Sequence, residues 1–79
     1  MKRTEIEGSS NIAEAGYDYD GQTMEIKFHN GSIYQYWPIT RSGWDLFTQA
    51  KSKGSYFAAH IRGNSGINYK RVDELQSDT

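Results

Sequence analysis

Tyrosine is frequent in this sequence, with six residues of this type among 79. A tyrosine ring is flat and apolar but carries one hydroxyl, so it can stack on a partner and also form a hydrogen bond with it. The set consists of two spaced pairs and two single rings: Tyr17 with Tyr19, Tyr34 with Tyr36, then Tyr56 and Tyr69. Because the last two lie close to lysines, the pattern is typical of surfaces that bind bases and phosphates. The sequence leaves open the alternative that most of these rings fill a core that is short of leucine.

Positive charge is concentrated in one part of the chain, although the net charge is only −1. Residues 1–40 carry three cations against six acidic residues, whereas residues 41–72 carry six cations against Asp45 alone, and residues 73–79 carry three acidic residues. A near-neutral chain does not attract DNA in bulk, and a local cationic stretch is a better match to a small anion. The alternative is an ordinary solvated helical face.

A phosphate site is indicated between two predicted helices, in the segment Lys51-Ser52-Lys53-Gly54-Ser55-Tyr56. If the second helix begins near Ser55, its first amide groups are unpaired and carry partial positive charge. Gly54 allows close approach of the backbone, and the serines and lysines add donors and charge. Three later cations are expected to bracket a second phosphate: Arg62, Lys70 and Arg71. The alternative is an ordinary capped junction with lysines that face solvent.

Alternation and turn residues predict the strands that must hold these side chains. Strands are predicted over 10–19, 23–29 and 32–37, with Asp20-Gly21 and Asn30-Gly31 as the hairpin turns. In the first strand, alternation places Ala15 and Tyr17 on one face and Ile12 on the other.

The face of the third strand depends on the turn at Asn30-Gly31. A two-residue turn places Ile33 and Trp37 in the core and leaves Tyr34 and Tyr36 on the open face. A three-residue loop with a glycine bulge reverses this arrangement. The sequence leaves both open.

Two helices are predicted after the strands, over 41–51 with Thr40 as N-cap and over 55–62 with Gly63 as C-terminal cap. Residues 67–72 form a short strand or an extended arm. The expected fold class is therefore α+β, a three-stranded antiparallel meander followed by two helices packed on one face. We expect a loose arm over 1–8, one domain over 9–72 and a mobile acidic tail over 73–79.

The sequence favours binding over catalysis. It has no cysteine, its two histidines (His29 and His60) lack metal-ligating spacing, and neither a nucleophile elbow nor a phosphate-loop fingerprint occurs. We therefore expect no enzyme activity, no metal and no cofactor. Since there is no long apolar run and no signal peptide, we expect a cytoplasmic protein that does not contact a membrane. A chain this small buries only about 60% of its unfolded surface, so a homo-oligomer is also expected.

The order of these features resembles the KTSC domain family, a short module found at the C-terminus of some lysyl-tRNA synthetases and as free-standing, often phage-encoded proteins. The matching positions run from Ser9 to Val72: Ser9-Ser10, Ile12, Gly16-Tyr17-Asp18, Met24, Ile26, Phe28, Gly31, Tyr34, Tyr36, Pro38, the helix 44–50, Ser52, Gly54, Tyr56-Phe57, Ile61-Arg62 and Tyr69. Trp37 stands directly before Pro38, where the family pattern has an aliphatic residue. The loop over 62–67 is longer than in the family pattern. The occurrence of the family in a tRNA synthetase implies RNA binding, whereas its free-standing members imply a small binding protein that acts without a partner domain.

The leading hypothesis is a non-enzymatic binder of a phosphate-bearing nucleotide, specifically a small phage-like sponge protein that sequesters a cyclic oligonucleotide signal. The expected ligand-binding residues combine rings, cations and helix-junction donors: Tyr34, Tyr36, Trp37, Lys51, Ser52, Lys53, Gly54, Ser55, Tyr56, Arg62, Tyr69, Lys70 and Arg71. Two alternatives stay open, an RNA-binding accessory module and a protein-interaction module that antagonises a host factor.

Overall fold

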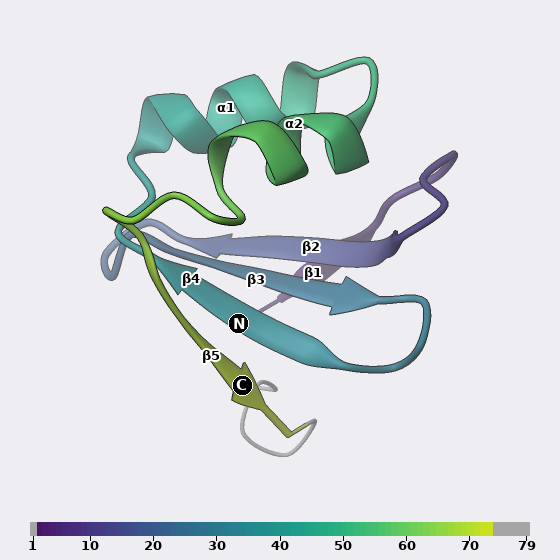
Figure 1. The fold of residues 1–79 in the computed structure, drawn as a ribbon, viewed down its shortest axis with the longest axis horizontal. Helices are drawn as coiled ribbons and strands as arrows, with labels where there is room; N and C mark the ends of the chain where they lie inside the picture. The colour runs from purple at the N-terminus through teal and green to yellow at the C-terminus, as the bar shows by residue number, and fades with distance from the viewer. Residues whose placement is uncertain (1, 74–79) are drawn as a thin grey trace.

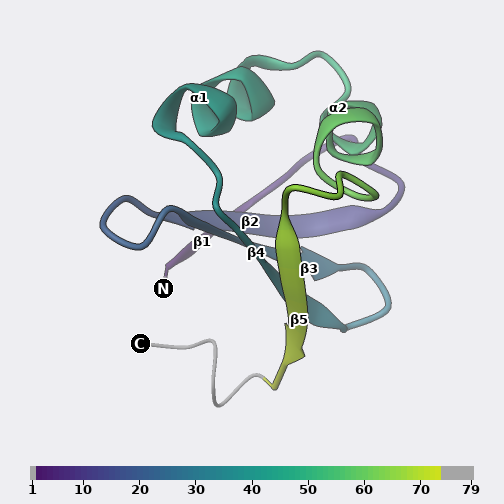
Figure 2. The same ribbon diagram turned by 60° about the vertical axis from the view of Figure 1, so that its left-hand side comes forward.

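Five antiparallel strands and two helices make up the computed structural model, which describes residues 2–73 (Figure 1). The elements are β1 (Arg3–Glu5), β2 (Ile12–Asp18), β3 (Thr23–Phe28), β4 (Ile33–Trp37), α1 (Arg41–Gln49), α2 (Lys53–His60) and β5 (Asn68–Val72). The strands pair in chain order, β1-β2-β3-β4-β5, so the sheet is a meander with β1 and β5 at its edges. Both helices cover the same face of the sheet (Figure 2). The predicted α+β class is confirmed, with five strands in place of three.

The turn between β3 and β4 decides which side chains face the helices. The Phe28 amide donates to the Ser32 carbonyl at 2.9 Å, which leaves a three-residue loop whose Gly31 has a φ of 92°. This is the glycine-bulge loop, the second of the two open alternatives. In the resulting register Tyr34 lies opposite Ile26 and Tyr36 lies opposite Met24. Both tyrosines therefore face the helices.

The core lies between the sheet and the helices. Its fully or almost fully buried residues are Ile12, Ala15, Met24, Ile26, Tyr36, Ile39, Phe47, Phe57 and Ile61. The prediction that Ile12 and Ala15 lie on opposite faces of β2 is wrong. The register of β2 against β3 shifts between Ile12 and Glu14, and this irregularity turns Ile12 back into the core.

Side-chain caps set the start of each helix. The Thr40 hydroxyl accepts a hydrogen bond from the Gly43 amide at 3.1 Å, as predicted for α1. The helix α2 begins at Lys53, two residues earlier than expected, because Ser52 is its cap and accepts from the Ser55 amide at 3.2 Å. Gly63 has a φ of 81°, as expected for a glycine after a helix C-terminus.

The first eight residues do not form the loose arm that we expected. Arg3–Glu5 is the edge strand β1, in which Arg3 pairs with Gly16 and Glu5 pairs with Glu14 of β2. Gly16 makes this approach possible, since a Cβ at this position would clash with the Lys2 carbonyl oxygen and lie 3.2 Å from the Arg3 Cα. At the other end, 67–72 contains β5 rather than an arm. Of the predicted mobile tail, residues 74–79 lie outside the described residues.

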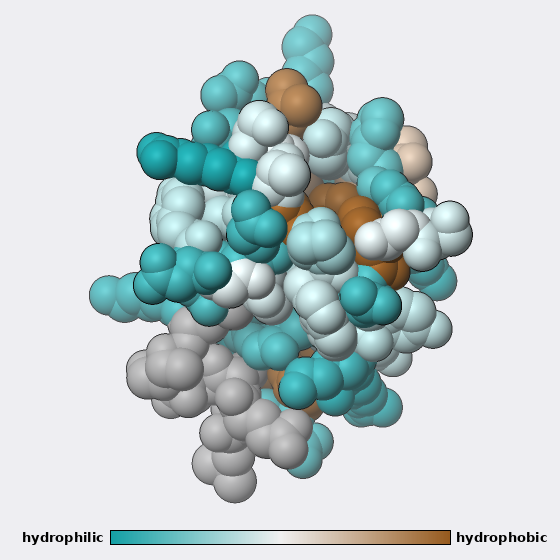
Figure 3. Space-filling view, turned by 90° about the vertical axis from the view of Figure 1, so that its left-hand side faces the viewer, coloured by the Kyte–Doolittle hydropathy of each residue, from teal (hydrophilic) through white to brown (hydrophobic). Residues whose placement is uncertain are grey.

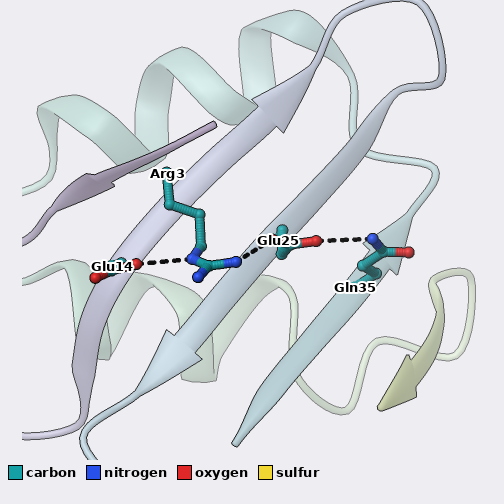
Figure 4. A network of polar contacts seen from close by, with 4 residues as sticks. All are labelled: Arg3, Glu14, Glu25 and Gln35. Carbon is teal, nitrogen blue, oxygen red and sulfur yellow. Dashed lines mark hydrogen bonds and ion pairs between the residues drawn. The ribbon is translucent and has the colours of Figure 1, made fainter. Parts of the chain in front are cut away.

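A polar network on the sheet face that points away from the helices holds the edge strand β1 against the rest of the sheet (Figure 4). Glu25 is fully buried there, and its carboxylate accepts hydrogen bonds from the Arg3 guanidinium and, at 2.7 Å, from the Gln35 amide. Arg3 also forms an ion pair of 2.8 Å with Glu14. A buried carboxylate is tolerated only when it is paired in this way. The network therefore explains why a three-residue strand is held in place.

None of the helices in residues 2–73 is both long enough and apolar enough to cross a membrane.

Candidate functional site

The helix-facing side of the sheet is only partly covered, and a groove of about 1030 Å³ lies between it and α2. Four parts of the chain line this groove: the residues before and at the start of β2, the β3–β4 hairpin, α2 with the loop that follows it, and β5. Hairpin residues His29 and Asn30 and loop residues Asn64 and Ser65 belong to this lining.

Tyr36 and Phe57 lie in the lining of the groove and are almost fully buried, with 6% and 3% of their surfaces exposed. Their ring centroids are 5.1 Å apart, and the rings meet edge to face at 80°. Burial raises the pKa of Tyr36 to about 12, although the nearby positive charge of Arg62 acts in the opposite direction. The hydroxyl of Tyr36 therefore stays protonated at neutral pH, and it can donate a hydrogen bond.

Three tyrosine rings form one cluster along the groove. The centroids of Tyr34 and Tyr36 are 6.3 Å apart, those of Tyr34 and Tyr69 are 6.3 Å apart, and those of Tyr36 and Tyr69 are 6.2 Å apart. Tyr36 is buried and Tyr34 is half-buried, whereas Tyr69 is 68% exposed. The cluster therefore presents Tyr69 as an open ring surface that two neighbouring rings support.

Two arginines lie on the same side of the sheet as these rings. Arg62 follows the C-terminal end of α2, lines the groove and lies close enough to Tyr36 to influence its pKa. Arg71 is the cross-strand partner of Tyr34 and shares its face, at the β5 edge. Both are exposed, and neither forms an ion pair with another residue of 2–73. They can therefore contact an anion.

The loop side chains at the groove are mostly held by local hydrogen bonds. The Asn64 side chain accepts from the Gly66 amide at 2.8 Å and donates to the His60 carbonyl at 3.2 Å. The Nε2 atom of His29 lies 3.0 Å from the Ser9 carbonyl oxygen. These contacts fix the shape of the opening. His29 and Asn64 were not among the predicted site residues, although hairpin and helix-end signals marked both segments as turns.

The segment at the start of α2 has the local hydrogen bonds of a capped helix, the alternative that the sequence left open beside a phosphate site. Ser52 accepts from the Ser55 amide, and its hydroxyl lies 2.9 Å from the Ser55 hydroxyl, so these groups satisfy one another. The Lys53 ammonium points back to the Ala50 carbonyl at 3.4 Å. Tyr56 packs on His60 at 4.5 Å between centroids, and neither ring lines the groove. Gly54 is the member of this segment that does.

Two further predicted residues lie on the opposite face of the sheet. Trp37 pairs with Asn68 and Lys70 pairs with Gln35, in positions that alternate with the tyrosines. The structure therefore brings together five of the predicted residues, with Arg71 beside them: Tyr34, Tyr36, Gly54, Arg62 and Tyr69. It separates them from the remaining ones: Trp37, Lys51, Ser52, Lys53, Ser55, Tyr56 and Lys70.

The space-filling view of Figure 3 shows one side of the molecule. Most of this side is hydrophilic or intermediate in hydropathy, and apolar residues reach the surface mainly in one small central area. Large contiguous apolar patches are typical of protein-interaction surfaces. Such a large patch is not seen on the part of this side that the described residues form.

Comparisons with known proteins show which family this chain resembles. A model of the KTSC domain family matches residues 8–64. The chain is similar to a crystal structure of a KTSC domain protein from Yersinia pestis, with 32% identity and a TM-score of 0.80 over 90% of this chain and 96% of that one. An uncharacterised protein from Stutzerimonas stutzeri is 32% identical over 57 residues, which cover 72% of this chain and 79% of that protein.

The chain is also similar to part of a larger enzyme. A lysine–tRNA ligase from Nostoc punctiforme is 35% identical over 54 residues, or 68% of this chain, and a second one from Trichormus variabilis matches equally well. The match spans only 10% of the length of each ligase. Because the family match covers β2 through α2, it contains both the hairpin and the α2 walls of the groove. The chain belongs to the KTSC domain family.

Proposed function

We propose that this chain is a non-enzymatic module that binds a phosphate-bearing nucleotide in the groove. The observation that carries the proposal is the position of Tyr69, an open ring that lines the same groove as Tyr36 and Arg62. A ring stacks on a base, a neutral hydroxyl donates to a base or sugar oxygen, and a guanidinium pairs with a phosphate. These three groups match the three chemical parts of a nucleotide.

The lining of the groove supports binding rather than catalysis. It contains His29 but no aspartate or glutamate, and His29 is engaged with the Ser9 carbonyl oxygen. General acid–base chemistry requires a titratable group within reach of the reacting atoms, and a second group usually orients or complements it. The described lining thus lacks the carboxylate that most often orients or complements a histidine.

A cyclic oligonucleotide, sequestered by a sponge protein, is the specific ligand that we propose to test first. The groove of about 1030 Å³ is large, yet two arginines supply the nearby positive charge, which suits a short ligand with few phosphates. The second candidate is a single-stranded segment of RNA. It is favoured by one observation, the similarity of this chain to part of two lysine–tRNA ligases.

Isothermal titration calorimetry against mononucleotides, cyclic dinucleotides and short RNAs tests the proposal. Tyr69→Ala should weaken binding by about 5- to 140-fold, because stacking contributes about 1–3 kcal/mol per base. Tyr19→Ala is the matched control, since this ring is 57% exposed but does not line the groove. An absence of heat with every ligand at millimolar concentration, or an equal effect of both substitutions, would overturn the proposal.

A further inference from the structure

The edge strand β5 carries one ring that lines the groove, Tyr69, and one cation, Arg71, that lies on the same face of the sheet outside the lining. Tyr69 and Arg71 alternate along β5, so both side chains lie on the helix side of the sheet, opposite Tyr36 and Tyr34 of β4. The segment that matches the KTSC family ends at residue 64, before β5 begins. This wall of the groove therefore lies outside the segment that the family model matches, although the similar KTSC structure spans 90% of this chain.

The spacing of the tyrosine rings decides how bases can be placed. The centroids within the cluster are 6.2–6.3 Å apart, and the planes of Tyr34 and Tyr69 are tilted by 44°. Rings at this separation contact each other directly, so no base fits between two of them. Each base must then stack on the outward surface of a single ring, and Tyr69 is the most exposed ring of the cluster.

The two arginines approach the cluster from different elements. Arg62 comes from the end of α2 and lies near Tyr36, while Arg71 comes from β5 and lies beside Tyr34. Each can hold one phosphate as a charge-assisted pair. The volume of about 1030 Å³ is at the upper end of the range of about 300–1000 Å³ found for pockets that hold one drug-sized ligand.

From these observations we infer that the groove has two nucleotide subsites and that its ligand consists of two nucleotide units joined by a phosphodiester. One subsite consists of Tyr69, Tyr36 and Arg62, the three groups of the proposed function, and the other consists of Arg71 of β5 with its cross-strand partner Tyr34. This inference rests on the proposed function. It assigns the second subsite to β5 and excludes a long strand as the preferred ligand, because two arginines neutralise two phosphates.

The test is calorimetry with a ligand series of increasing length. The series contains the 5′-monophosphates of the four RNA nucleosides, their 5′-phosphorylated linear dinucleotides, cyclic di-AMP and cyclic di-GMP, and homopolymeric RNA decamers. A two-unit ligand should bind at least about tenfold more tightly than its mononucleotide, and the decamer should gain no more than about threefold over the dinucleotide. With two phosphates neutralised, the logarithm of the association constant should fall with the logarithm of salt concentration with a slope of about −1.4.

Substitution of Arg71 assigns the second subsite. Arg71→Ala should lower the affinity of the two-unit ligand to about that of the mononucleotide and leave the mononucleotide unchanged within about twofold. Arg62→Ala should weaken both ligands. Lys70→Ala is the matched control, since Lys70 is adjacent in sequence but lies on the opposite face of the sheet, opposite Gln35. Thermal melting of each variant shows whether β5 still folds.

The outcomes separate the two proposals. If mononucleotides bind but length and Arg71→Ala have no effect, the two-subsite inference fails and nucleotide binding stands. If affinity rises steadily up to the decamer, the ligand is a longer RNA and the inference also fails. If no nucleotide binds, the proposed function itself fails. Tighter binding of cyclic than of linear dinucleotides identifies a cyclic signal as the source, and the reverse identifies an RNA end.

Discussion

Tyr36 and Tyr69 lie directly opposite each other on β4 and β5, with ring centroids 6.2 Å apart. Their exposure nevertheless differs widely, at 6% for Tyr36 and 68% for Tyr69. Side chains in register on one face of paired strands support each other, so the buried ring holds the exposed ring at the edge of the groove. The pair therefore combines a buried ring of the groove lining with an open stacking surface at the rim.

The buried phenol of Tyr36 makes the stability of the fold depend on pH in alkaline solution. Its pKa is raised to about 12, from about 10 in the unfolded chain. Between these values the unfolded state binds fewer protons than the folded state, so the free energy of unfolding falls as pH rises, by up to about 1.4 kcal/mol per pH unit. Tyr36→Phe should make this slope shallower in urea unfolding at about pH 9, 10 and 11.

The control for this measurement is Tyr69→Phe, which removes the hydroxyl of the exposed partner ring. This variant should keep the wild-type slope. A Tyr36→Phe protein that loses stability with pH as steeply as the wild type would show that the buried phenol is not the group responsible.

Ser52 should contribute to stability and not to ligand binding. Its hydroxyl caps α2 by accepting from the Ser55 amide, and the residue does not line the groove. Loss of such a cap costs about 1 kcal/mol, so Ser52→Ala should lower the free energy of unfolding by about that amount. Nucleotide affinity should change by less than about twofold. Thr40→Ala, which removes the cap of α1, should have the same two effects.

Binding that falls tenfold in Ser52→Ala but not in Thr40→Ala would restore the phosphate site at the start of α2 that the sequence predicted. Chemical denaturation and calorimetry on the same two proteins distinguish these outcomes.

The sequence was a good guide to the elements whose signals are local. The hairpin at Asn30-Gly31, the cap at Thr40 and the cap glycine at Gly63 all lie where turn and helix-end chemistry places them. β1 was missed because its three residues have no periodicity, and the partners that hold it, Gly16 and Glu25, are distant in sequence. A local sequence pattern cannot predict a short strand that tertiary contacts stabilise.

The candidate site could be predicted only in part, for a reason of geometry. Alternation along a strand fixes which residues share a face, but not which face that is. A single extra loop residue brought Tyr34 and Tyr36 into the groove and took Trp37 to the other side, and the same alternation separated Arg71 from Lys70. The charge count of the 41–72 stretch carried no information about faces, and the structure distributes its cations over several of them.

Gly16 should be sensitive to the smallest possible substitution. In Gly16→Ala the new methyl group would clash with the Lys2 carbonyl oxygen, and the nearest atoms belong to the backbone of Lys2 and Arg3 rather than to a side chain that can move. We expect a loss of about 1–3 kcal/mol in the free energy of unfolding and faster hydrogen exchange in β1. Gly54→Ala is the control, because its methyl group would meet only the Ser9 hydroxyl at 3.4 Å and alanine favours a helix. Equal stability of the two variants would contradict the close packing of β1 on β2.

The ion pair between Arg3 and Glu25 should be needed mainly because Glu25 is buried. Arg3→Met removes the cation and leaves a fully buried carboxylate with the Gln35 amide as its remaining neighbour in the network, which should cost about 3–5 kcal/mol in urea unfolding. The double variant Arg3→Met with Glu25→Met should recover most of this loss, since an apolar pair of similar volume often replaces a buried ion pair without cost. Lys2→Met, at an exposed neighbouring position, should change stability by less than about 0.5 kcal/mol. If Arg3→Met unfolds the protein outright, the circular dichroism of the double variant decides the question. An unfolded double variant would mean that the ion pair itself specifies the position of β1. A folded double variant would mean that burial of an unpaired charge was the cause.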